Sequence, residues 1–137
     1  MKPPVEILGS GPFTLAVANH GEIRTFTRRG VADLLELLAD GEEFLRGAAV
    51  ADKVVGRAAA SIMVIGGVAR LHTRVMSRQA LGILDGSGME VEYDGLTDHV
   101  INRRGDGWCP LENICRNLDT PEECLMEIRK FFENNAN

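Results

Sequence analysis

Two cationic side chains and a glycine lie close together in the segment 52–57, a pattern suited to holding an anion. Asp52 precedes a long apolar run that we expect to form a helix, and Asp is common at a helix N-cap. The first turn of a helix presents free N–H groups and a positive dipole end, which favour phosphate. Lys53 and Arg57, four residues apart, would share one helical face. Gly56 would let a ligand approach the backbone closely.

The same residues also have an ordinary structural interpretation. Asp52 would cap its helix, while Lys53 and Arg57 would extend to solvent. Gly56 would then serve only the close packing of helix on sheet. The segment therefore predicts either a pocket for a nucleotide-like or phosphorylated ligand, or a plain helix start.

Cys109 is the residue best suited to act as a nucleophile. It precedes Pro110, which favours the first helical position, so Cys109 is expected at the N-cap of a helix. A thiolate there would be stabilised by the helix dipole and by free N–H groups. Glu112 opposes this with a second negative charge, or reaches back to the Cys109 N–H as in a capping box. Cys109 is therefore either a reactive thiol or a capping residue.

A polar, glycine-bearing loop over residues 97–108 supplies the third group of candidates. It contains His99, Asn102, Arg103, Arg104 and Asp106. Long polar loops on a rigid scaffold often carry function, although a plain surface loop would also explain this composition. We expect the loop and Cys109 to close a pocket over the predicted helix start.

The cysteines and histidines do not form a metal-binding pattern. Cys109, Cys115 and Cys124 are an odd number without metal-finger spacing, and we expect them to be reduced. Cys115 and Cys124 fall on apolar helical stripes, which predicts core positions. His20 lies in a predicted turn and His72 in a predicted strand, and neither has a partner at ligand spacing. The sequence therefore predicts no metal site and no cofactor.

The composition of the 137-residue chain indicates one globular domain over residues 1–137. The formal net charge of −5 argues against sequence-independent binding of nucleic acid. No apolar run approaches the ~20 residues that span a bilayer, and no secretory signal is visible at the N-terminus. We therefore expect a cytoplasmic protein that does not bind membranes.

The first half of the chain predicts the elements that would hold the candidate residues. Alternating residues at 13–17 and 23–27, joined by turn residues at 19–21, indicate a β-hairpin. An amphipathic helix is predicted over 31–40. Residues 52–65 are apolar on every side, which predicts a helix buried between a sheet and other helices.

Beyond this buried helix the pattern alternates between strand and helix. Strands are predicted over 68–76 and 89–93, with a helix between them that Ser77 caps. This alternation favours parallel pairing through a crossover helix. A short strand is predicted at 99–101, and two short helices with proline at the first position complete the chain.

The order hairpin, buried helix, strand, helix, strand, helix is that of the cytidine deaminase-like fold. Two motifs narrow the comparison, namely ADKVVGRAAA at 51–60 and the segment from Ile101-Asn102-Arg103 to Gly107-Trp108-Cys109-Pro110-Leu111-Glu112. With them, the chain from Leu15 onward resembles a small uncharacterised prokaryotic family, a domain of unknown function. The resemblance implies a three-layer sandwich whose mixed sheet has about five strands, with helices on both faces. The first helix usual in this fold is not evident before Phe13.

The resemblance also implies that deaminase zinc chemistry is absent. True deaminases hold zinc with a His or Cys at one helix start and two Cys at the next, and use a Glu as proton shuttle. The corresponding segments here read Asp52-Lys53 with Gly56-Arg57, and Ser77-Arg78-Gln79-Ala80. Ordinary zinc-dependent deamination is therefore not expected.

Three functional hypotheses follow. The first is a zinc-free deaminase-like protein that binds a nucleotide or related phosphorylated small molecule at the Asp52 helix start. The second is an enzyme that uses Cys109 as nucleophile, or Lys53 as an acid/base or Schiff-base residue. The third is a regulatory or interaction subunit without a ligand, and the resemblance also allows a homo-oligomer. The ligand-binding candidates are Asp52, Lys53, Gly56, Arg57, His99, Asn102, Arg103 and Glu112.

Overall fold

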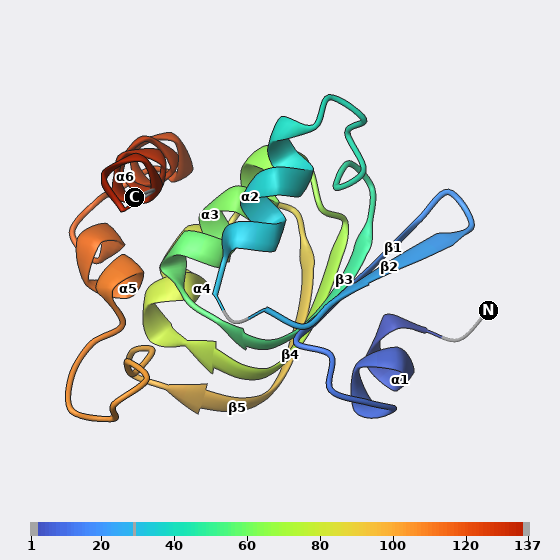
Figure 1. Cartoon of the computed structure of the whole chain (residues 1–137), viewed down its shortest axis with the longest axis horizontal. Helices are drawn as coiled ribbons and strands as arrows, with labels where there is room; N and C mark the ends of the chain where they lie inside the picture. The colour runs from blue at the N-terminus through green and yellow to red at the C-terminus, as the bar shows by residue number, and fades with distance from the viewer. Residues whose placement is uncertain (1–2, 29, 136–137) are drawn as a thin grey trace.

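The computed structural model describes residues 3–28 and 30–135, which form an α/β fold on one five-stranded sheet (Figure 1). The strands are β1 (Leu15–Asn19), β2 (Glu22–Phe26), β3 (Ala49–Val55), β4 (Arg70–Ser77) and β5 (Glu90–Thr97). The helices are α1 (Pro4–Gly9), α2 (Ala32–Ala39), α3 (Arg57–Gly66), α4 (Arg78–Leu84), α5 (Pro110–Cys115) and α6 (Pro121–Asn134). The strand order is β2-β1-β3-β4-β5.

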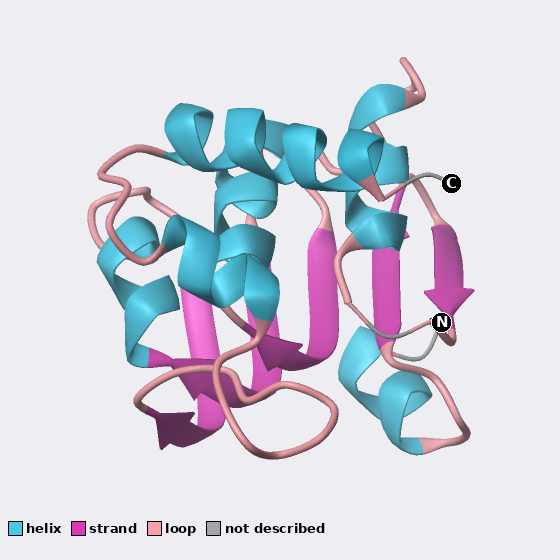
Figure 2. Cartoon of the chain, turned by 60° about the vertical axis from the view of Figure 1, so that its left-hand side comes forward, coloured by secondary structure: helices cyan, strands magenta, loops and turns pink. Residues whose placement is uncertain are grey.

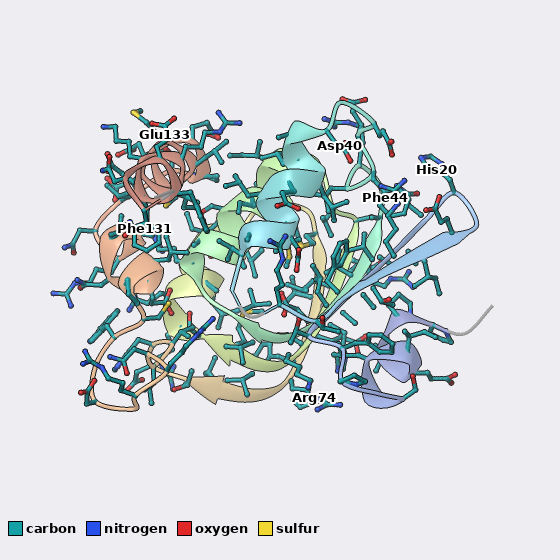
Figure 3. The ribbon with its side chains drawn as sticks, viewed as in Figure 1. His20, Asp40, Phe44, Arg74, Phe131 and Glu133 are labelled. Atoms are coloured by element: carbon teal, nitrogen blue, oxygen red, sulfur yellow. The ribbon has the colours of Figure 1, made fainter. Side chains whose placement is uncertain are left out.

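The sheet is mixed, as the sequence predicts. β1 pairs antiparallel with both β2 and β3, whereas β3, β4 and β5 run parallel. Parallel neighbours need a crossover, and α3 and α4 supply the two crossovers here. The β1–β2 hairpin turns at His20 and Gly21, both with positive φ, and Figure 3 shows His20 at its tip.

Helices cover both faces of the sheet. The core combines strand residues such as Val17, Val50 and Leu71 with α3, and α3 in turn contacts α2, α4, α5 and α6. On the opposite face α1 packs against β1 and β3, where Ala16 and Ala51 are fully buried. Figure 2 shows α1 standing apart from the other helices.

Local signals located several helix ends correctly. Ser77 Oγ accepts a hydrogen bond from the Ala80 N–H at 3.0 Å, and Thr120 Oγ1 accepts one from the Glu123 N–H at 3.1 Å. Cys115 and Cys124 are both fully buried, as their apolar stripes predict. No helix among the described residues is long and apolar enough to cross a membrane.

The predicted start of the buried helix is wrong. Residues 49–55 form the central strand β3, and α3 begins only at Arg57 with Gly56 as its N-cap. The reason is that a central strand of a parallel sheet carries apolar residues at successive positions, and periodicity cannot separate such a run from a buried helix. Asp52 and Lys53 therefore lie on a strand and share no helical face with Arg57.

Two smaller expectations also need correction. A helix does precede Phe13, because α1 occupies Pro4–Gly9 with proline in its first turn. The strand predicted at 99–101 is reduced to a single antiparallel bridge between Ile101 and Trp108.

Candidate functional site

A cavity of about 890 Å³ lies beside the carboxyl ends of the parallel strands. Ligands of open α/β sheets commonly bind at this edge. Its apolar lining comes from the sheet, from the first turn of α3 and from the loop after β5, with Leu15, Val54, Val75, Ala58, Ala59 and Ile101 among the contributors. The volume falls within the usual range of small-molecule sites.

The cavity gathers most of the candidates from the sequence. Its lining includes Asp52, Lys53, Gly56, His99, Asn102, Arg103, Cys109 and Glu112. Arg57 is not part of the lining. Arg104, from the same candidate loop, lines the cavity as well. The two motifs, more than 40 residues apart in the chain, thus meet around one hollow.

Asp52 places a carboxyl group on the inner face of the sheet. It pairs with Leu15 on β1 and Thr73 on β4, so these three side chains share one face. Burial raises the pKa of Asp52 to about 7, although the N–H groups of Val54 and Lys53 oppose this in part. Strand alternation directs Lys53 to the opposite face, so the two side chains point away from each other.

The raised pKa of Asp52 predicts a pH-dependent stability. The folded chain keeps this carboxyl protonated up to about pH 7, whereas the unfolded chain releases the proton near pH 3.8. The contribution of Asp52 to the free energy of unfolding should therefore fall as pH rises from about 4 to 7. Asp52→Asn should be more stable than wild type by about 2 kcal/mol at pH 8, and equal to it near pH 4.

Denaturant unfolding of the two proteins across this pH range measures the difference. Glu112, His99, Cys109, Lys53 and the two loop arginines also surround the cavity, but they are present in both proteins and cancel in the difference. Asp119→Asn, at an exposed site, should keep the wild-type profile. A difference between wild type and Asp52→Asn that does not change with pH would refute the expectation.

Glu112 closes the amino end of α3. It is only 2% exposed, and its Oε1 accepts from the Arg57 N–H at 2.7 Å while its Oε2 accepts from the Val100 N–H at 2.9 Å. The carboxylate thus occupies the place where an anion was expected to bind. The predicted capping box with Cys109 is wrong, because the Cys109 N–H donates to the Val100 carbonyl at 2.8 Å.

Gly56 makes room for this contact. A Cβ atom at Gly56 would lie 2.9 Å from Val100 Cγ2 and 3.0 Å from Glu112 Oε1. The backbone of Gly56 is extended, so its role is steric rather than conformational. The glycine admits the protein's own carboxylate to the helix end, where the sequence suggested a ligand.

The Arg57 side chain turns away from the cavity. Its Nη1 donates to the Gln79 carbonyl at 2.7 Å, and its Nε and Nη2 donate to the Leu118 carbonyl at 3.1 and 2.5 Å. Gly82 leaves the space that this guanidinium fills, since a Cβ there would lie 2.9 Å from Nη1. Arg57 therefore joins α3 to α4 and to the chain before α6, and its predicted place in the pocket is wrong.

The loop after β5 is shaped by Asn102. Its Oδ1 accepts from the N–H groups of Gly105 and Asp106 at 2.8 and 3.2 Å, and its Nδ2 donates to Asp106 Oδ1 at 2.8 Å. This side chain therefore fixes the turn that presents the neighbouring arginines. Arg103 and Arg104 are exposed, and among the described residues Arg103 makes no ion pair. The two arginines thus place positive charge at the mouth of the cavity.

Trp108 is a residue that sequence reasoning missed as a contributor. Its ring stacks on His99 with centroids 4.0 Å apart and an interplanar angle of 6°, and the Arg116 guanidinium lies 4.8 Å from the Trp108 ring. A lone Trp in a polar loop was a usable signal, because aromatic rings in loops often support binding surfaces. In residues 3–28 and 30–135, no group of three or more His, Cys, Asp and Glu side chains is arranged to hold a metal ion.

These features define a class of α/β protein with a mixed five-stranded sheet and a hollow at the carboxyl ends of its parallel strands. The chain belongs to the family TM1506, described as a domain of unknown function (DUF1893), which matches residues 5–132. The resemblance to an uncharacterised family is thereby confirmed, whereas the cytidine deaminase-like label stays a prediction.

A solved bacterial structure shows the same architecture. The crystal structure of a DUF1893 family protein (TM1506) from Thermotoga maritima has a TM-score of 0.85 and 27% sequence identity. The match covers 93% of this chain and 86% of that one. A comparison with curated proteins finds no match.

Proposed function

We propose that this protein binds a nucleotide or a related phosphorylated small molecule in the cavity beside β3. The observation that carries the proposal is the combination of a hollow of about 890 Å³, a carboxyl group inside it and arginines at its mouth. Binding sites of this kind are mostly apolar, with a few polar groups that orient the ligand. The proposal keeps the hypothesis of a zinc-free binding protein but places the phosphate of the ligand at a different position from the one expected from the sequence.

The phosphate belongs at the mouth rather than at the start of α3. Glu112 already occupies the amino end of that helix and would repel a second anion there. Arg103 and Arg104 are exposed at the cavity and carry guanidinium groups, which bind phosphate through two parallel N–H groups. A ligand whose body lies inside the cavity and whose phosphate lies at the mouth keeps the phosphate away from the Glu112 carboxylate and close to the two arginines.

The apolar walls supply the remaining binding energy. Val54 is 44% exposed and Ile101 is 49% exposed, and both line the cavity. Covering such side chains gains about 25 cal/mol for each Å² removed from water. A ribose and a flat ring, which have partly apolar faces, match this lining.

Calorimetric titration of the four common ribonucleoside monophosphates, each beside its nucleoside, tests the proposal. At least one monophosphate should bind, and more tightly than its nucleoside. The double variant Arg103→Ala with Arg104→Ala should weaken the monophosphate about ten- to a hundredfold, because charge-assisted hydrogen bonds are lost. It should leave the nucleoside unchanged.

Arg129→Ala, at an exposed position of α6, removes a comparable charge away from the cavity and should bind as wild type does. Failure of all four monophosphates to bind would overturn the proposal. A monophosphate affinity that is indifferent to both loop arginines would overturn the assigned position of the phosphate.

A further inference from the structure

The wall of the cavity next to β5 ends in a fixed aromatic ring. His99 lines the cavity, whereas Trp108, stacked on it at 4.0 Å, does not. Arg116 also lies over the Trp108 ring, and of these three groups His99 is the one that lines the cavity. A ring held in this way offers a flat surface without first having to be ordered.

The two carboxyl groups in the described lining differ in whether they bind distant parts of the chain. Both oxygens of Glu112 accept backbone hydrogen bonds. No side chain in the described part of the chain hydrogen-bonds to the Asp52 carboxyl, which interacts with the backbone N–H groups of Val54 and Lys53. Because Asp52 also lines the cavity, its oxygens can accept further hydrogen bonds from a ligand.

An open carboxylate in an apolar hollow selects for the groups it can hydrogen-bond. Its two oxygens accept two parallel N–H donors, as in a carboxylate–guanidinium fork. A ligand that covers the carboxylate without supplying donors leaves a charge desolvated, which costs binding energy. A planar ring with an N–H beside an amino group, as on the edge of guanine, supplies both donors.

We propose that the cavity selects phosphorylated ligands whose planar ring carries two adjacent N–H donors, with the ring edge on Asp52 and the ring face on His99. This inference rests on the proposed function and specifies its ligand class. Asp52 is the specificity-determining residue, and His99 is the stacking surface. The phosphate is held at the mouth by Arg103 and Arg104, as proposed above.

The matched pair GMP and IMP isolates the second donor, because IMP lacks only the amino group. Titrated at pH 8, where the Asp52 carboxyl is charged, the wild-type protein should bind GMP about ten- to a hundredfold more tightly than IMP. In Asp52→Asn the ratio should fall below about threefold, whereas the exposed control Asp119→Asn should keep it.

The stacking surface has its own pair of variants. His99→Ala should weaken GMP and IMP by the same factor, about tenfold, because base–aromatic stacking is lost. His99→Phe keeps a flat ring and should retain most of the affinity. His20→Asn, in the hairpin turn, removes a histidine elsewhere and should have no effect.

Equal affinity of the wild-type protein for GMP and IMP would overturn this inference while leaving the proposed function in place. An unchanged ratio in Asp52→Asn would overturn the role of that carboxyl. Absence of binding by every nucleoside monophosphate would instead remove the proposed function, and this inference with it.

Discussion

Replacing Glu112 with alanine should lower the free energy of unfolding by about 3 kcal/mol, because two partly buried N–H donors lose a charged acceptor. In the native chain Glu112 accepts from the N–H groups of Arg57 and Val100. Its charge also complements the positive dipole end of α3. The substitution therefore weakens the helix start and the cavity loop together, and denaturant unfolding measures the loss.

Glu112→Gln separates the charge from the shape of the side chain. Its amide oxygen still accepts a hydrogen bond, but its NH₂ group then faces a second donor, so stability should fall by less than in Glu112→Ala. Glu133→Ala, on the exposed side of α6 (Figure 3), should change stability by less than about 0.5 kcal/mol. A Glu112→Ala protein as stable as wild type would contradict this account.

The elements that the sequence predicts well are those with strong local signals. The hairpin around His20-Gly21 follows from residues that tolerate positive φ, and the caps at Ser77 and Thr120 follow from side chains that bond within three residues. Each of these signals acts between residues close in the chain, so it does not depend on tertiary contacts. The α/β class was predictable for another reason, because strand and helix patterns alternate along the second half of the chain.

The start of α3 was not predictable, because it depends on the sheet. Val50, Val54 and Val55 favour a strand, whereas the alanines after Gly56 favour a helix. Polar and apolar residues do not alternate in this segment, so the pattern does not show where the strand ends and the helix begins. Only pairing with β1 and β4 on both sides makes 49–55 a strand. α1 was missed because six residues are too few for a periodic pattern.

The candidate site was predictable as a set of residues but not as a geometry. The two motifs do converge on one cavity, yet Glu112 bonds to Arg57, 55 positions away in the chain. A contact between residues so far apart in the chain produces no local sequence pattern. The sequence therefore suggested only a capping interaction of Glu112 with the nearby Cys109. The cations at 53 and 57 looked equivalent for the same reason, although strand and helix direct them to different places.

Arg57 connects three separate segments, and this makes it the second position where a large loss is expected. Its guanidinium supplies donors to the carbonyls of Gln79 and Leu118, which belong to α4 and to the chain before α6. Arg57→Met keeps the apolar stem but leaves both carbonyls without this donor. We expect a loss of about 2–4 kcal/mol in the free energy of unfolding, since hydrogen bonds to charged groups are the stronger ones.

A second readout shows where the Arg57→Met protein loosens. Cys115 and Cys124 are fully buried where α5 and α6 pack against α3. Thiol reagents should therefore label them faster in Arg57→Met than in Glu112→Ala, when the two variants are compared under conditions that give them the same free energy of unfolding. Arg57→Lys should be nearly as damaging, because one ammonium group cannot reproduce the planar fork between two carbonyls. Arg129→Met is the exposed control. Wild-type stability together with wild-type labelling in Arg57→Met would show that the guanidinium does not tie these segments together.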